Sequence, residues 1–381
     1  MIAVVIFWAA LLLMLYAYLG YPALIGALAR LRPHPAMRTA RLPQVTLVVV
    51  AHDEVDRIGT RIDNLGDLDY PRESLEILIA SDGSTDGTAE RALARAPSGM
   101  RVVAFPTRRG KPAVLNEIVP QARGEIVVLA DARQRFDRGA VRALVAFFDD
   151  AAVGAVSGDL ILTEDGRDAA VGLGVSAYRR YESFVRRSES RVDSTVGATG
   201  AIYAMRRSLF QPLPEDTILD DVLIPMRIVR RGYRVLFDPA ARAFDRAPAT
   251  AREEFGRKAR TLSGNFQLLF REKWLLNPID NPLWVQTVSH KVLRLLGPVL
   301  LVAAFASNLS LLGRPGYRLV FLAQIAFYAG ALLGGMLHGR KGVFPLFSLP
   351  YTFCLVNAAA LVGAFRFFAS RQRVTWDKAP A

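Results

Sequence analysis

Two kinds of hydrophobic pattern divide the 381-residue chain. Long apolar runs occupy both ends, at residues 1–29 and at about 293–312, 317–337 and 343–365. Apolar runs of about 20 residues are long enough to cross the hydrocarbon core of a bilayer as helices. Between them, short β-branched runs alternate with segments whose apolar residues recur every three or four positions. The pattern therefore predicts one N-terminal and about three C-terminal transmembrane helices around an α/β domain.

The middle of the chain has the pattern of a mainly parallel sheet. Five strands are expected, at residues 42–50, 75–80, 101–105, 126–130 and 153–162. Helical segments separate the first four of them. The strand at 126–130 is continuously apolar, which is typical of a central strand covered on both faces. This alternation predicts a Rossmann-like doubly wound sheet, in which ligands bind at the carboxyl ends of the strands.

Acidic side chains follow three of these strands. Asp53 and Glu54 come after the first strand, Asp82 after the second and Asp131 after the fourth. A single acidic residue at such a place is usually a solvated turn residue. Several carboxylates in one crevice repel one another, however, and a common relief is Mg²⁺ or Mn²⁺ shared with substrate phosphates. We therefore expect a divalent cation and a nucleotide-diphosphate substrate at this edge.

A further acidic pair, Asp220 and Asp221, precedes a helical segment. Pro225 lacks an N–H and is tolerated in the first turn of a helix, so the pair should lie at or just before the helix start. A carboxylate is stabilised there by the helix dipole, either as a cap or as an ionised base. This stretch alone does not separate the two roles.

Basic residues outnumber acidic ones, 48 to 35, which gives a net charge of +13. In a chain with apolar spans this excess favours attraction to anionic lipids. Nucleic-acid binding is disfavoured because no helix-turn-helix, zinc-ligand or RNA-binding motif is present. Arg257 and Arg260 share one face of an expected helix at residues 253–270, where they can hold phosphate oxygens or face solvent.

The distribution of basic residues predicts the topology. Four arginines follow the first span, which places the middle domain in the cytoplasm: Arg30, Arg32, Arg38 and Arg41. Arg294 and Arg318 lie near the ends of later spans, from which they can reach the headgroups. The segment at 274–284 is expected to lie in the membrane interface. The basic tail at 371–381 conflicts with four full crossings, so the orientation of the C-terminus stays open.

Six motifs in order carry a resemblance to a known family. They are VVVAHDE, ASDGSTDGT, RRGKPAVLNE, GEIVVLADAR, GATGAIYAMRR and LDDVLIPMRIVRRGYRV, and they cover about residues 42–275. The chain resembles the family 2 glycosyltransferases, with a GT-A nucleotide-sugar fold, and its flanking spans resemble those of the branch that builds polysaccharides or glycosylates lipids. We accordingly expect a GT-A domain at 42–250, amphipathic helices at 251–290 and a transmembrane region at 291–370.

The resemblance implies a role for each motif. Asp221 would be the general base of an inverting sugar transfer, and Asp131 would bind the metal, Mg²⁺ or Mn²⁺. The donor, a UDP-sugar by this resemblance, would contact Ala51, Asp53, Glu54, Asp82, Lys111, Asp131 and Arg133. The acceptor or the diphosphate would contact Asp220, Arg257 and Arg260. A lipid or a growing polysaccharide would be the acceptor, and the protein would be an integral protein of a bacterial inner membrane.

Two positions depart from the family pattern. Arg133 stands where the family's DxD motif has its second acid, so it either supplies positive charge or weakens metal binding. Thr261 stands where processive synthases have a tryptophan after the second arginine of their (Q/R)xxRW motif, which leaves processive synthesis open. A catalytically degenerate membrane scaffold and a sugar nucleotidyltransferase remain as alternatives.

Overall fold

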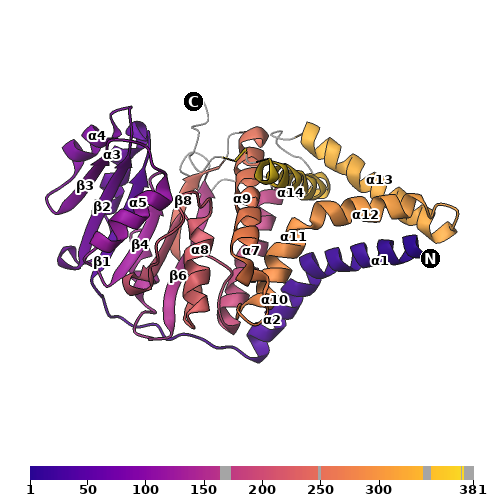
Figure 1. Ribbon diagram of the computed structural model, residues 1–381, viewed down its shortest axis with the longest axis horizontal. Coiled ribbons are helices and arrows are strands. Elements are labelled where there is room, and N and C mark those ends of the chain that lie inside the picture. Colours follow the sequence, from indigo (N-terminus) through magenta and orange to yellow (C-terminus); the bar gives the residue numbers. More distant parts are fainter. Residues whose placement is uncertain (164–172, 248–249, 338–344, 370, 373–381) are drawn as a thin grey trace. The chain divides into compact units, whose positions relative to one another are not determined.

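The computed structural model describes residues 1–163, 173–247, 250–337, 345–369 and 371–372. These residues fall into two compact units, which Figure 1 shows with their elements labelled. The helical unit comprises Met1–Ala27, Ala170–Val185 and Pro248–Gln372. The sheet unit comprises Leu28–Ala169 and Arg186–Ala247. The predicted basic tail, from residue 373 onward, lies outside the described residues.

The sheet unit contains an eight-stranded sheet in the order β3-β2-β1-β4-β7-β6-β8-β5. Its first half is parallel, as the sequence predicts, and consists of β1 (Val45–Ala51), β2 (Leu75–Asp82), β3 (Met100–Phe105) and β4 (Ile126–Asp131). On β1, Val50 lies opposite Asp131 and Ala51 lies opposite Ser81. The strand ends that carry Asp82 and Asp131 therefore meet at one edge of the sheet.

The second half of the sheet is mixed. It consists of β7 (Ile202–Arg206), β6 (Val153–Thr163), β8 (Arg234–Arg246) and the short β5 (Arg135–Phe136). Strand β7 runs antiparallel to both β4 and β6, whereas β6 and β8 run parallel. An apolar pattern identifies a buried strand but not its direction, so the sequence predicts the α/β class without this reversal.

Helices cover the sheet and complete its core. They are α3 (Val55–Gly66), α4 (Thr88–Arg95), α5 (Lys111–Ile118), α6 (Ala140–Val145) and α8 (Asp220–Arg230). Helix α3 packs on α4, and α5 packs on β1 and β2 (Figure 1). The buried core joins strand and helix residues, among them Leu47, Val49, Ile58, Ile62, Leu65 and Val128.

The helical unit contains the candidate membrane spans. Among the residues that the structure describes, three helices are long and apolar enough to cross a bilayer, and a fourth candidate span exists if one bent pair counts as a single crossing. The three are Ile2–Leu31, Pro315–Met336 and Phe347–Phe368, and the pair is Trp284–Leu295 with Gly297–Leu309. The pair bends by 58°. Pro298 lies in the first turn of α12 (Gly297–Leu309), where its missing N–H is tolerated. The predicted apolar helices are confirmed as candidate spans within the described residues, except that 293–312 belongs to this bent pair.

The first span is nearly continuous through α1 (Ile2–Leu15), a π-helical turn at Tyr16–Gly20 and α2 (Tyr21–Leu31). It packs along α12, and α13 (Pro315–Met336) packs on α14 (Pro345–Phe368), as Figure 1 shows.

In the described part of the chain, two long helices outside these spans are amphipathic: α7 (Leu173–Val192) and α9 (Ala251–Arg271). The sequence predicts the second of them. The amphipathic helices expected at 251–290 are interrupted at residues 274–284. That segment forms a 3₁₀ turn at Lys273–Leu276 and then a turn before α10 (Trp284–Gln286). Buried Asn281 stabilises it by donating to the carbonyl of Leu275 and to the hydroxyl of Thr287.

The guanidinium of Arg294 donates to Glu182 of α7, and only 12% of its side chain is exposed. Its reach toward the headgroups stays a prediction.

Candidate active site

The turn after β1 is tied to the turn after β2. Asp53 adopts a left-handed conformation, with φ of 51°. Its carboxylate accepts from the backbone N–H of Thr85 at 2.9 Å, and its own N–H donates to the hydroxyl of Ser84 at 3.2 Å. His52 Nδ1 lies 2.6 Å from the carbonyl oxygen of Asp82. The two predicted nucleotide-binding turns therefore form one rigid rim at the edge of the sheet.

Asp82 organises the next loop. It is 3% exposed, and its carboxylate accepts from the backbone N–H groups of Arg109 at 2.7 Å and Gly110 at 2.8 Å. Gly83 permits this approach, because its φ is 58° and a Cβ there would lie 2.2 Å from the backbone nitrogen of Arg108. Asp82 thereby fixes the start of α5, where Lys111 lies.

Lys111 joins three elements of the site. Its ammonium lies 2.8 Å from Oδ1 of Asp131, at the end of β4, and 3.2 Å from Oδ2 of Asp220, at the start of α8. Burial alone would lower the pKa of Lys111, but the charges of the two carboxylates outweigh burial and raise it above its usual value. The lysine therefore supplies a fixed positive charge at neutral pH.

Asp221 lies beside this ion pair and is held by a glycine-rich loop. Its Oδ2 accepts from the N–H of Gly200 at 2.8 Å, and its carbonyl accepts from the N–H of Ala198 at 2.7 Å. Pro225 explains the second bond. Pro225 is the sixth residue of α8, so it lies beyond the first turn, where the sequence predicts it. Because proline has no N–H, it makes no helical hydrogen bond to the carbonyl of Asp221, and that carbonyl is free to accept from the loop.

The environment of Asp221 suits a proton acceptor. Burial and the neighbouring charge of Asp220 raise its pKa from 3.8 to about 6, although Lys111 and the N–H of Gly200 act in the opposite direction. A carboxylate whose pKa lies near the working pH can both accept a proton and release it. Capping alone does not require these features, and the role of Asp221 as a base stays a prediction.

The residues described contain no group of three or more His, Cys, Asp or Glu side chains arranged to hold a metal ion. Asp131 nevertheless offers a carboxylate that is 23% exposed at the end of β4. Mg²⁺ typically takes one or two protein carboxylates and completes its shell with water and substrate phosphates. The donor set therefore fits a cation held jointly by Asp131 and a diphosphate.

The other predicted residues have different surroundings. Ala51 is buried at the end of β1, and Arg133 lies in the turn after Asp131. Glu54 forms an ion pair with Arg57 at 2.9 Å, one turn along the chain. Arg257 and Arg260 lie on α9 of the helical unit, where Arg257 pairs with Glu253 at 2.6 Å. Their part in donor or acceptor binding stays a prediction.

Three residues near Asp131, Asp220 and Asp221, which together form the acidic cluster, were not predicted from the sequence. Gly200 was only part of the motif GATGAIYAMRR, yet it donates to the proposed base. Tyr203 on β7 is fully buried, and burial raises its pKa well above the usual value, with the cluster's carboxylates adding to the effect. Arg61 of α3 is 3% exposed, lies over the ring of Phe136, and acts on Asp131 by its charge. Arg61 could have been identified from the sequence, because it is a charged residue on the apolar face of a predicted helix.

The comparisons with known proteins agree with this fold. A family model described as glycosyltransferase like family 2 matches residues 43–273. A poly-beta-1,6-N-acetyl-D-glucosamine synthase from Staphylococcus aureus is 26% identical over 250 residues, which cover 64% of this chain and 59% of that protein. The synthase of the same name from Staphylococcus epidermidis is 22% identical over 362 residues, which cover 87% of this chain and 86% of that protein.

A solved structure has the same arrangement. The mannosyltransferase PcManGT from Pyrobaculum calidifontis, in complex with GDP-Man and Mn²⁺, aligns with a TM-score of 0.72 at 24% identity, over 96% of this chain and 99% of that chain. At this identity the likeness shows the fold, which is the GT-A fold. Because the family model covers more than half of the chain, the protein belongs to the glycosyltransferase 2 family.

Proposed function

We propose that the protein transfers a sugar from a nucleotide-sugar to a hydroxyl of an acceptor at the membrane, with inversion at the anomeric carbon. The observation that carries this proposal is Asp221, which has a pKa of about 6 and lies beside the Lys111–Asp131 ion pair. A base and a fixed cation beside each other match the two needs of the reaction, which are proton removal and neutralisation of a departing diphosphate.

Asp221 accepts the proton of the acceptor hydroxyl while the oxygen of that hydroxyl attacks the anomeric carbon. The bond between this carbon and the diphosphate oxygen breaks, and the nucleoside diphosphate leaves with both bonding electrons. Lys111 stabilises the leaving group by its charge, and Gly200 holds the carboxylate of Asp221 in position. The rim formed by Asp53 and Asp82 orients the nucleoside of the donor.

We propose Asp131 as the protein ligand of a divalent cation, Mg²⁺ or Mn²⁺. When bound, such a cation stabilises negative charge on the diphosphate. The partly exposed carboxylate of Asp131 supports this assignment, as does the Mn²⁺ in the complex of PcManGT. Arg133, which replaces the family's second acidic ligand, would add positive charge beside the same phosphates.

The donor and acceptor classes follow from the relatives. We propose a UDP-sugar carrying a hexose or an N-acetylhexosamine, and a growing polysaccharide or a lipid as acceptor. The names of the staphylococcal relatives support the polysaccharide. We place the protein in a bacterial inner membrane with the sheet unit in the cytoplasm, since Arg30, Arg32, Arg38 and Arg41 follow the first span.

The test uses the full chain reconstituted in lipid vesicles with a panel of UDP- and GDP-sugars. Nucleoside diphosphate release that depends on a divalent cation supports the proposal, whereas pyrophosphate release would identify a nucleotidyltransferase. Asp221→Asn should reduce turnover by at least about a hundredfold, the lower range for loss of a general base, with donor affinity nearly unchanged. Asp131→Ala should instead weaken donor binding and the response to metal.

A matched control is Asp63→Asn, because Asp63 is an exposed acid of the sheet unit that pairs with Arg95. It should retain full turnover. Wild-type turnover in Asp221→Asn would remove this residue as the base, and calorimetry without binding of any nucleotide-sugar would favour a scaffold without catalysis.

A further inference from the structure

The helical unit contains a cavity of about 450 Å³, which is separate from the acidic cluster of the sheet unit. Its volume falls within the range of about 300 to 1,000 Å³ that is typical of ligand sites. Its walls come from three of the candidate span segments together with α7 and α9. The charged and polar residues that line it include Glu182, Asn265, His290, Lys291 and Arg294.

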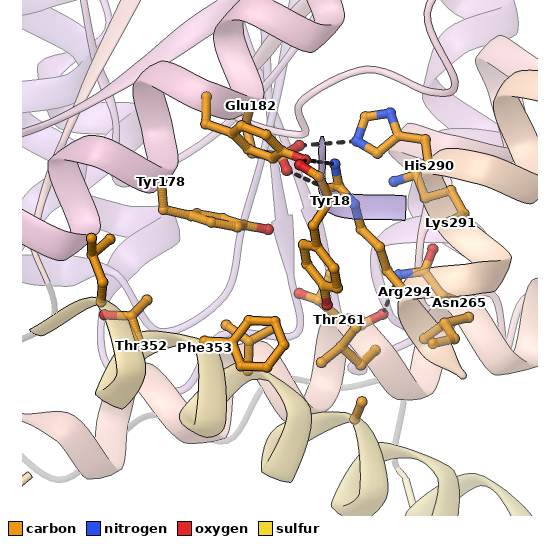
Figure 2. A pocket seen from close by; sticks show the side chains of 16 residues that line it. Tyr18, Tyr178, Glu182, Thr261, Asn265, His290, Lys291, Arg294, Thr352 and Phe353 are labelled. Carbon is orange, nitrogen blue, oxygen red and sulfur yellow. Dashed lines mark hydrogen bonds and ion pairs between the residues drawn. The ribbon is translucent and has the colours of Figure 1, made fainter. Parts of the chain in front are cut away.

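One end of the cavity is a charged network. Figure 2 shows Glu182, His290 and Arg294 grouped there. Glu182 accepts from Arg294 and lies 3.0 Å from Nε2 of His290. The hydroxyl of Tyr181 accepts from the same guanidinium at 3.0 Å and donates to the carbonyl of Tyr18 at 3.0 Å. The network fixes Arg294 in one orientation at the cavity wall.

Positive charge exceeds negative charge at this end. Burial would raise the pKa of Glu182, but the charge of Arg294 and the contact with His290 outweigh it and hold the pKa well below its usual value. The carboxylate is thus ionised and offsets one positive charge, while Lys291 adds another. In addition, the buried Nε of Arg294 has no hydrogen-bond partner within the described part of the chain. An oxygen of an anionic group would satisfy this donor.

The opposite wall is apolar. Helix α14 contributes one face, on which Leu349, Phe353, Val356 and Ala360 recur every three or four residues. Figure 2 shows Phe353 and Thr352 across the cavity from the charged network. A ligand that meets both walls must be amphipathic, with an anionic head and an apolar body. Because candidate membrane spans form these walls, a lipid is the amphipathic molecule available to them.

We propose that this cavity binds a phosphate-bearing membrane lipid, with its phosphate against Arg294 and Lys291 and its chain along the inner face of α14. The site is distinct from the acidic cluster, and the inference does not depend on sugar transfer. The lipid would tie α14 to α7 and to the bent pair, all of which contribute to the cavity lining.

The experiment uses native mass spectrometry of the purified full chain in detergent, with phosphatidylglycerol and with diacylglycerol of the same acyl chains. We expect the phosphatidylglycerol adduct to persist and the diacylglycerol adduct to be at least about fivefold weaker, the loss expected for one basic residue near an anionic headgroup. Inorganic phosphate in excess should leave the lipid adduct in place, because it lacks the apolar body.

Two pairs of variants test the location. Lys291→Gln should weaken phosphatidylglycerol binding about fivefold, whereas Lys273→Gln changes an exposed lysine outside the cavity and should not. Ala360→Leu fills the apolar wall and should also reduce binding, whereas Ala358→Leu adds the same volume at an exposed position of α14. These substitutions leave the pair of Arg294 with Glu182 intact, so folding should be preserved.

Four results would overturn the proposal. Equal retention of diacylglycerol would show that the phosphate is not recognised, and displacement of the lipid by inorganic phosphate would indicate a site for the free anion. Equal effects of the lysine variants at 291 and 273 would indicate lipid bound to the outer surface. Displacement by a soluble neutral oligosaccharide would make the cavity a sugar site.

Discussion

Replacement of Asp220 by asparagine should shift the pH dependence of the reaction toward acid. Asp220 is, after burial, the second cause that raises the pKa of Asp221 to about 6, and it also holds Lys111 at 3.2 Å. Removing the charge of Asp220 removes its repulsion of the Asp221 carboxylate. It also removes one of the carboxylates that pair with Lys111, so the ammonium acts more strongly on Asp221. Both effects stabilise the ionised form of the base, so its pKa falls.

The expected size can be worked out from the structure. The pKa of Asp221 lies about 2 above its ordinary 3.8. Burial, the larger cause, persists in the variant, so we expect a fall of about one pH unit, which corresponds to roughly 1.4 kcal/mol. At an effective dielectric constant of about 20, two unit charges interact this strongly at about 12 Å. The carboxylates of consecutive residues, whose Cα atoms are about 3.8 Å apart, lie closer than that.

The assay is kcat/KM for nucleoside diphosphate release, measured from acid to neutral pH, because this ratio reports the free enzyme. In the wild type, activity should rise with pH as Asp221 loses its proton near pH 6. In Asp220→Asn the same rise should lie about one pH unit lower, roughly the full effect of the removed charge. Asp63→Asn should leave it unmoved. If kcat/KM rises at the same pH in Asp220→Asn and in the wild type, the proposed effect of Asp220 on the pKa of Asp221 is refuted.

Three further substitutions test the surroundings of the site and of α9. Gly200→Ala places a Cβ 3.1 Å from Oδ2 of Asp221 and should lower kcat several-fold. The control Gly66→Ala has open space around it and should leave kcat unchanged. Equal kcat values in the two variants would argue against positioning of Asp221 by the loop. In Gly83→Ala the new Cβ clashes with the backbone of Arg108, and the residue keeps a φ of 58°. The variant should have a lower melting temperature, measured by circular dichroism, and weaker donor binding. An unchanged melting temperature would contradict the close approach of the two backbone segments. Thr250→Ala removes the side-chain cap of α9 and should cost about 1 kcal/mol in a denaturant titration, and a cost near zero would show that the cap is dispensable.

Much of the fold could be predicted from the sequence because hydrophobic period and length are local properties. The continuous apolar run at 126–130 predicted a central strand, and β4 is buried between β1 and β7. The apolar ends predicted the candidate spans. The direction of β7 was not predictable, because it depends on the path of the chain between strands. The sequence likewise gave no sign that Arg294 would find a partner, since Glu182 lies over a hundred residues away.

For the site, the sequence by itself determined which carboxylates follow strands and which pair begins a helix. Those features depend on neighbouring residues, so Asp82, Asp131 and Asp221 could be named from the chain alone. Only the tertiary structure decided that Lys111 joins Asp131 to Asp220 and that the loop at Gly200 holds Asp221. The physical reason is that pairing and desolvation set the charge of a group, and both arise from residues brought together across the sheet.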